Sequence, residues 1–122
     1  MGQVCLDTSI VIEFVKGNQN IASLIDKFSI FYIPAIVTYE YGRGKLTIEE
    51  VKEDLKDFNF INLDINIVLK AIEIYKSLIK RGEIIDDNDI IIGACCIMNN
   101  LPLLTLNKKH FEKLKKFGLM VV

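Results

Sequence analysis

The sequence predicts a three-layer α/β fold, in which helices cover both faces of a central, mostly parallel sheet. Short apolar segments rich in β-branched residues alternate along the chain with longer segments of helical periodicity, the pattern that such a sheet requires. The chain has 122 residues, enough for one domain with its own core and too few for two. We therefore expect a single α/β domain over residues 1–122.

The predicted elements of the first half begin and end at recognisable signals. Thr8 and Ser9 can cap the first helix, Gly17 ends it, and Pro34 ends the second strand. In order, these elements are a strand at residues 3–6, helices at 8–16 and 21–28, a strand at 30–33 and a helix at 35–43.

In the second half, Thr47 and Glu50 form a capping box, Asp64 caps a long amphipathic helix, and Asp87 is the expected N-cap of a helix that is apolar almost all round. Such a helix must be buried on most sides. The predicted elements are a helix at 48–58, a strand at 60–63, helices at 65–81 and 88–98, a strand at 101–104, a helix at 108–117 and a strand at 119–122.

The composition excludes a disordered chain and a membrane-spanning one. Hydrophobic residues make up 51% and charged residues 25% of the sequence, close to the globular norm. No apolar stretch approaches the roughly 20 residues that span a bilayer, so we expect a cytoplasmic protein without a membrane partner. Cys5, Cys95 and Cys96 lie within apolar stretches, which predicts buried free thiols.

The charge balance gives no general affinity for nucleic acid. The net charge is −1 and the pI is 5.8, yet a local basic patch can still bind RNA. Arg43 and Arg81 are the only arginines among 15 basic residues, and isoleucine is frequent. This usage fits an AT-rich genome or a thermophile equally well.

Three carboxylates are distinguished by their positions along the chain. Ligands of a parallel sheet bind at the carboxyl ends of its strands, and Asp7 follows the first strand directly. Glu40 lies in a short apolar and aromatic helix after the second strand, and Asp89 opens the most apolar helix. The alternatives are an N-cap role for Asp7 and an ion pair with Arg43 for Glu40.

Three carboxylates at one edge repel one another and raise their own pKa values unless a cation neutralises them. Oxygen ligands alone select a hard cation, Mg²⁺ or Mn²⁺, over zinc. The sequence therefore predicts a metal site formed by Asp7, Glu40 and Asp89. Most of the remaining acids fit exposed helix faces or helix caps.

Four motifs, in this order and spacing, resemble those of PIN-domain proteins, above all the VapC-type toxins of prokaryotic toxin–antitoxin pairs. They are VCLDTS at residues 4–9, TYEYGRG at 38–44, NDIIIGA at 88–94 and LTLNKKHF at 104–111. The resemblance covers nearly the whole chain. It implies a PIN-like fold and a metal-dependent endoribonuclease that hydrolyses RNA phosphodiester bonds.

The resemblance also implies roles for particular residues. Asp7 and Asp89 would hold the cation directly, and Glu40 would act through a water or as a general base. The fourth family position carries Asn107, where an Asp is common, so one charge is missing and a single Mg²⁺ or Mn²⁺ is expected. Asn107 would then hold a metal-bound water or a phosphate oxygen.

Several neighbouring side chains are expected to support this site. Ser9 and Thr105 can orient the ligating carboxylates or waters by hydrogen bonding. Lys108 and Lys109 can bind RNA phosphates, with a solvated helix face as the alternative. His110, the one histidine, is expected to have a structural or surface role, because this metal chemistry requires no imidazole.

The partners implied by the resemblance are an RNA substrate, a small antitoxin that blocks the acidic pocket with a basic side chain, and a second copy of the chain in a homodimer. Two alternatives stay open: a PIN nuclease of RNA processing or decay without an antitoxin, and a non-catalytic PIN-like module that binds RNA or protein. A nucleotide-binding domain is disfavoured, since no Gly-rich turn follows the first strand. A small upstream reading frame for a DNA-binding antitoxin would decide between a toxin and a PIN nuclease that has no antitoxin.

Overall fold

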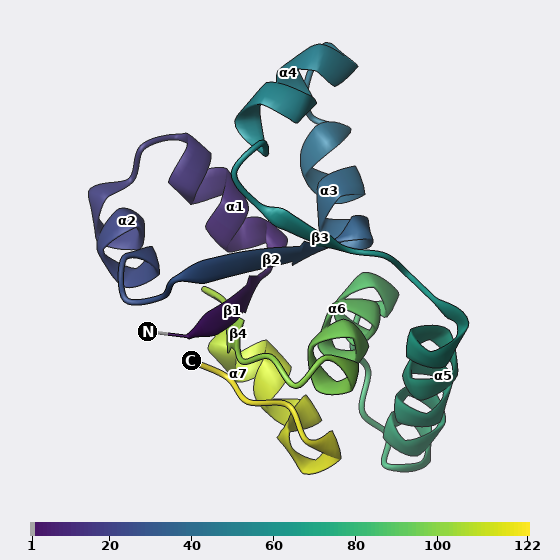
Figure 1. Ribbon diagram of the computed structural model, residues 1–122. Coiled ribbons are helices and arrows are strands. Elements are labelled where there is room, and N and C mark those ends of the chain that lie inside the picture. The colour runs from purple at the N-terminus through teal and green to yellow at the C-terminus, as the bar shows by residue number, and fades with distance from the viewer. Residues whose placement is uncertain (1) are drawn as a thin grey trace.

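A computed structural model describes residues 2–122 of the chain (Figure 1). Met1, which the single-domain prediction includes, lies outside the described residues. Within them, a four-stranded parallel sheet has the strand order β3-β2-β1-β4. Its strands are β1 (Gln3–Leu6), β2 (Ile30–Pro34), β3 (Asn59–Ile61) and β4 (Leu103–Leu104). The expected parallel α/β architecture is confirmed.

Helices cover both faces of this sheet, as Figure 1 shows. On one side lie α1 (Thr8–Val15), α2 (Gln19–Ile25), α3 (Ala35–Gly42) and α4 (Ile48–Asp54), and on the other α5 (Ile65–Lys80), α6 (Asp87–Met98) and α7 (Lys108–Phe111), which continues as the 3₁₀-helix η1 (Glu112–Phe117). The chain steps from β1 to β2 to β3 in one direction and then returns to the far side of β1, so right-handed crossovers place the later helices on the opposite face. None of the helices in residues 2–122 is both long and apolar enough to cross a membrane.

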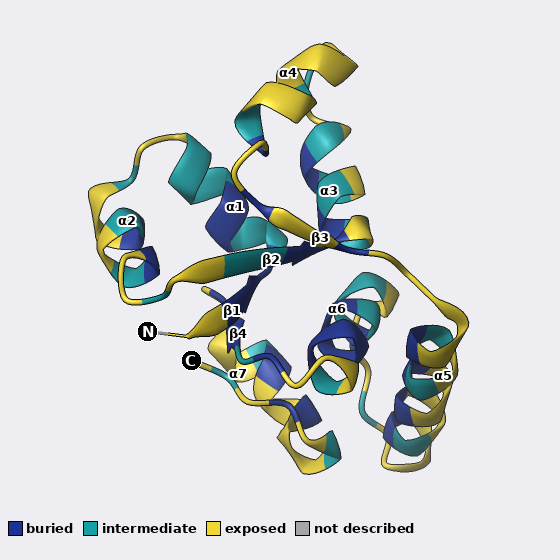
Figure 2. Cartoon of the chain, in the orientation of Figure 1, coloured by how far each residue is buried: buried dark blue, intermediate teal, exposed yellow. Residues whose placement is uncertain are grey.

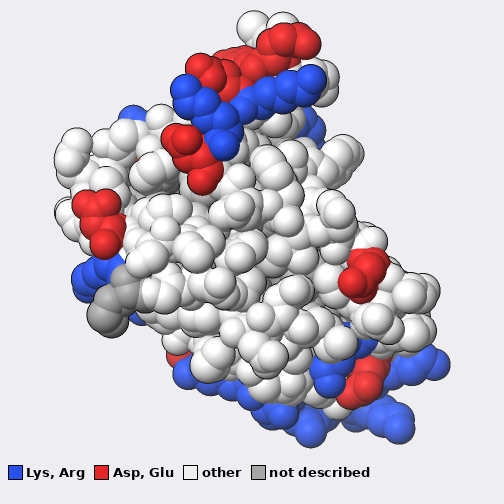
Figure 3. All heavy atoms as spheres, in the orientation of Figure 1, with Lys and Arg blue, Asp and Glu red and all other residues white. Residues whose placement is uncertain are grey.

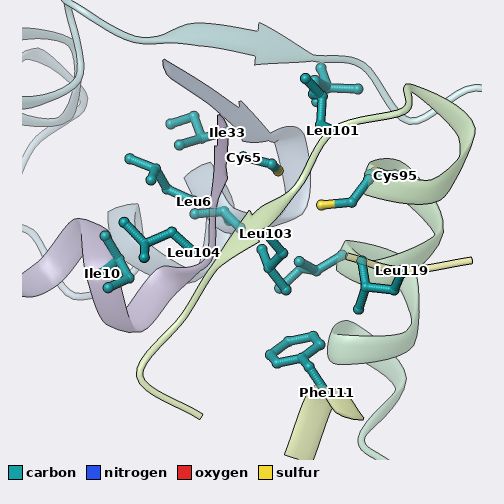
Figure 4. Close-up of a cluster of buried hydrophobic side chains, with 14 of the residues drawn as sticks. Cys5, Leu6, Ile10, Ile33, Cys95, Leu101, Leu103, Leu104, Phe111 and Leu119 are labelled. Carbon is teal, nitrogen blue, oxygen red and sulfur yellow. The ribbon is translucent and has the colours of Figure 1, made fainter. Parts of the chain in front are cut away.

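The central strand β1 is buried on both faces. Val4, Cys5 and Leu6 have no exposed surface, which explains why β1 is a continuous apolar run rather than an alternating one. Cys5 pairs with Tyr32 on one side and with Leu103 on the other. Figure 2 shows the dark blue of buried residues along β1, and Figure 4 shows its side chains packed between the two helical layers. The three cysteines are buried free thiols, as predicted.

The last two predicted strands of the chain are shorter than expected. The strand predicted at 101–104 is reduced to β4, because Pro102 has no N–H to donate, although its carbonyl accepts a hydrogen bond from the Cys5 N–H at 2.8 Å. The strand predicted at 119–122 is wrong in extent, since it forms one parallel bridge between Val121 and Leu103.

Helix boundaries differ from the predictions where a neighbouring polar side chain makes the cap. The side chain of Asn18 accepts hydrogen bonds from the N–H groups of the first turn of α2, so this helix begins before residue 21. Asp86, and not Asp87, caps α6, because its carboxylate accepts from the Asn88 N–H at 3.2 Å. Asp87 is therefore the first residue of the helix.

Candidate active site

Asp7 lies at the point where the strand order reverses. β2 lies on one side of β1 and β4 on the other, so the carboxyl end of β1 opens onto the gap between the connections that leave in opposite directions. Asp7 is 4% exposed. Its Oδ1 accepts hydrogen bonds from the Ser9 hydroxyl at 2.7 Å and from the Ile10 N–H at 3.1 Å, so it also caps α1.

Thr105, which follows β4, completes the environment of Asp7. Its hydroxyl donates to Asp7 Oδ2 at 2.5 Å and accepts from the Asn107 N–H at 2.9 Å. Burial raises the pKa of Asp7 above its ordinary value, and the hydrogen bonds from Thr105 and Ser9 oppose that rise. The repulsion of Glu40 adds to the rise. Asp7 is thus a buried carboxylate whose charge is only partly compensated.

Glu40 projects from α3 and is held by side chains of two other helices. Its Oε1 accepts a hydrogen bond from the Thr8 hydroxyl at 2.5 Å, and its Oε2 accepts one from Asn88 Nδ2 at 2.9 Å. The alternative of an ion pair with Arg43 is not realised, because the Arg43 guanidinium lies over the Tyr39 ring at 5.7 Å from its centroid.

Asp89 lies in the first turn of α6 and is half-buried. Burial raises its pKa from 3.8 to about 6, against the opposing effect of His110. The charges of Asp86, Glu40 and Asp7 contribute to the rise. His110 Nε2 lies 3.2 Å from Asp89 Oδ2, a close contact that lacks the alignment of a hydrogen bond.

The structure therefore brings Asp7, Glu40 and Asp89, hereafter the acidic site, into one electrostatically coupled group from three separate segments. The oxygen-only chemistry of the three side chains and the raised pKa values of Asp7 and Asp89 fit a hard divalent cation. Among residues 2–122, however, no three His, Cys, Asp or Glu side chains already form a metal-binding cluster. Asp7 instead accepts hydrogen bonds from Ser9 and Thr105, and Glu40 accepts them from two other side chains. A cation would have to draw the three carboxylates closer together.

Asn107 and the predicted RNA-binding lysines lie in a hollow of about 410 Å³ beside this site, hereafter the basic hollow. The hollow is lined by Leu106, Asn107, Lys108, Lys109, His110 and Lys113. Asn107 is exposed, and its side chain makes no capping hydrogen bond to α7. Lys108 and Lys109 form no ion pair within the described part of the chain, and His110 joins the hollow to Asp89.

Sequence reasoning did not single out three residues at this site. Thr8 was expected only as a cap, Asn88 only as the first residue of a predicted helix, and His110 as structural or surface. The available signal was adjacency: Thr8 follows Asp7, Asn88 precedes Asp89, and His110 lies three residues after Asn107. Adjacency alone does not show which way a side chain points, so the contacts became visible only in the structure.

An acidic group at the reversal point of a parallel sheet lies where α/β proteins of this topology bind their ligands. Residues 4–116 match the PIN domain family. Ribonuclease VapC1 of Methanocaldococcus jannaschii is 35% identical, over 98% of this chain and 86% of the relative. The chain belongs to the PIN-domain family.

Solved structures share the fold across the whole chain. VapBC2 from Rickettsia felis, bound to a DNA fragment of its promoter, superimposes with a TM-score of 0.79 at 24% identity, covering 100% of this chain and 98% of that one. FitAcB from Neisseria gonorrhoeae gives a TM-score of 0.81 at 18% identity, covering 97% and 95%. At these identities the likeness concerns the fold.

Proposed function

We propose that this chain is an endoribonuclease that hydrolyses RNA phosphodiester bonds with one Mg²⁺ or Mn²⁺ ion, and that it is the toxin of a toxin–antitoxin pair. The observation that carries the proposal is the convergence of Asp7, Glu40 and Asp89 at the carboxyl edge of the sheet, where burial raises the pKa of both aspartates. A relative named as a VapC ribonuclease supports the activity.

The chemistry divides between the cation and the side chains. When bound, the cation supplies charge that polarises the phosphate and lowers the pKa of a water. Asp7 and Asp89 are the proposed direct ligands, and the hydrogen bonds of Ser9 and Thr105 fix the orientation of Asp7. Glu40 orients the attacking water or accepts its proton. Asn107 adds no negative charge, which favours one cation over two.

The basic hollow is the proposed path of the RNA backbone. Lys108 and Lys109 lie beside Asn107, and their charges are not neutralised by an acidic side chain within residues 2–122. Figure 3 shows lysine and arginine side chains gathered at the lower end of the molecule, where α7 and η1 lie. Phosphates bound there would lead the chain toward Asp89, which contacts His110 at the wall of the hollow.

A homodimer is supported by the outward face of α5. Leu69, Ile72, Tyr75 and Ile79 are each about half exposed on this face. Part of it borders a groove of about 380 Å³ between α5 and α6 that is mostly apolar. Exposed apolar area of this kind is characteristic of protein interfaces. Figure 3 shows the broad centre of the viewed face without charged side chains.

A small antitoxin is the second proposed partner. The solved relatives from Rickettsia felis and Salmonella typhimurium are VapBC structures with DNA, and a similar pairing in the cytoplasm would control this chain. A basic side chain of the antitoxin would occupy the acidic site and neutralise the carboxylates. The experiment is co-expression with any small upstream reading frame; an antitoxin would co-purify and suppress cleavage, and its absence would leave a nuclease of RNA processing or decay.

Asp7→Asn and Asp89→Asn test the activity directly. Each should reduce cleavage of a structured RNA with Mg²⁺ or Mn²⁺ by roughly 100-fold or more, because each removes a charged ligand. Asp57→Asn, at an exposed position in the turn that follows α4, is the matched control and should cleave like the wild type. Unchanged cleavage by either site variant would refute the assignment.

A further inference from the structure

The Glu40 carboxylate is held by side chains that belong to two other helices. Both of its oxygens accept a hydrogen bond from a neutral side chain, Thr8 at 2.5 Å and Asn88 at 2.9 Å. Neither donor belongs to α3. Thr8 is the first residue of α1, and Asn88 lies in the first turn of α6. The carboxylate therefore links the beginnings of two of the helices against which α3 packs.

The two donors are the chain neighbours of the other two acids. Thr8 follows Asp7, and Asn88 precedes Asp89. A movement of either backbone segment would thus displace one site carboxylate and one donor to Glu40 together. The spacing among the three acids is tied through the Glu40 side chain as well as through the backbone.

Without these donors, two effects would favour movement of the Glu40 side chain away from Asp7 and Asp89. Its charge contributes to the raised pKa of Asp7 and of Asp89, so the three groups repel one another. A glutamate side chain also gains rotamer freedom when it is released. Two hydrogen bonds to an ionised acceptor, each stronger than a neutral pair, oppose both effects.

The identity of the donors matters as well as their number. A cation such as Arg43 would hold Glu40 and also neutralise it, but Arg43 lies over Tyr39 instead. A hydroxyl and an amide fix the carboxylate and leave its full negative charge in place. That negative charge can attract a divalent cation and can accept the proton of an attacking water.

We propose that Thr8 and Asn88 are positioning residues that clamp the Glu40 carboxylate at a fixed spacing from Asp7 and Asp89 without neutralising it. The inference rests on the proposed ribonuclease function and assigns Glu40 its part in it. In this arrangement the two aspartates are the direct ligands, and the clamped Glu40 acts on the reaction through a water.

The test compares variants that keep or remove one hydroxyl. Thr8→Val preserves the shape of the side chain and removes the donor, whereas Thr8→Ser keeps it. Mn²⁺ affinity is measured by calorimetry, and kcat and KM are measured on a short RNA. Thr8→Val and Asn88→Ala should each lose about 10-fold in Mn²⁺ affinity and in kcat, with KM unchanged, because neighbours of metal ligands contribute on this scale. Thr8→Ser should stay within about 2-fold of the wild type.

A double-mutant cycle separates the clamp from a general structural effect. If Thr8 acts through Glu40, Thr8→Val should cost nothing further in a Glu40→Ala background. Thr47→Val is the control for loss of a threonine hydroxyl, because Thr47 caps α4 through the Glu50 N–H at 3.1 Å, outside the acidic site. It should lower thermal stability and leave Mn²⁺ affinity unchanged.

Two outcomes would overturn the proposal. One is equal Mn²⁺ affinity and kcat in Thr8→Val and Thr8→Ser; the other is an undiminished 10-fold loss from Thr8→Val when Glu40 is already alanine. Failure of the wild type to cleave RNA would instead refute the proposed function. The Mn²⁺ affinities of the variants would still decide whether Thr8 and Asn88 hold Glu40.

Discussion

Replacing Asp89 by asparagine should stabilise the metal-free protein. Asp89 has a pKa of about 6 in the folded chain against an ordinary value of 3.8, mainly because burial disfavours its charged form. Above pH 6 the folded state therefore carries the cost of a charge that the unfolded chain solvates freely. Asparagine has nearly the same shape and no charge, so the variant avoids this cost.

The magnitude follows from the pKa. A rise from 3.8 to about 6 corresponds to about 3 kcal/mol at most, and the partial exposure of the Asp89 side chain reduces it to about 2 kcal/mol. In a chain of 122 residues this is roughly 5–10 °C in Tm. The pH dependence is opposite to that of a salt-bridged aspartate, which stabilises the folded state at neutral pH. Here the charged Asp89 destabilises the folded state fully above pH 6, and this destabilisation disappears as the pH falls toward 4.

Urea unfolding in EDTA at pH 7.5 and at pH 5 measures the effect. The free energy of unfolding of Asp89→Asn should exceed that of the wild type by about 2 kcal/mol at pH 7.5, and this difference should narrow at pH 5. Asp57→Asn, an exposed change, should match the wild type at both values. Added Mg²⁺ should stabilise the wild type more than Asp89→Asn and so close the gap. A metal-free Asp89→Asn protein no more stable than the wild type at pH 7.5 would refute the reasoning.

Three further predictions concern packing, thiol reactivity and assembly. A Cβ on Gly93 would come within 2.4 Å of a methyl of Leu114, which is fully buried, so Gly93→Ala should lower the free energy of unfolding by about 1–3 kcal/mol in urea titration. Burial raises the pKa of Cys95 to about 12, and the other two cysteines are equally buried. A thiol-labelling reagent at pH 8 should therefore modify none of the three before the chain unfolds. Rapid labelling of the folded protein would contradict this prediction. Leu69→Lys on the outer face of α5 should convert the proposed dimer to monomer by light scattering, whereas Ile48→Lys on α4, exposed to a similar degree, should not; equal masses for the two variants would count against α5 as the interface.

Much of the fold was predictable because each element carries its own signal. The apolar run at residues 3–6, the long amphipathic helix after Asp64 and the N-cap at Thr47 all lie where local patterns placed them. The Glu50 side chain reaches the Leu46 N–H instead of the Thr47 N–H, so the capping box is only half formed. The errors fall where local preference competes with pairing. Pro102 shortens β4, and residues 119–122 have only a two-residue strand to pair with, so they form one bridge.

The candidate site was predictable to a different degree. Asp7, Glu40 and Asp89 could be proposed as a group because strand ends of a parallel sheet share an edge, which is a rule of topology. The partners of Glu40 could not, because Thr8 and Asn88 meet it only through the packing of α1, α3 and α6. No periodicity within one segment encodes how three helices converge.

The sheet order has a consequence for when the protein can act. Thr105 donates to Asp7 across 98 positions of sequence, and β4 is the strand that pairs with the free side of β1. A growing chain therefore carries Asp7 well before it can enclose it, because Thr105 is synthesised 98 positions later. For the proposed ribonuclease, the acidic site is therefore incomplete until β4 and Thr105 have been synthesised.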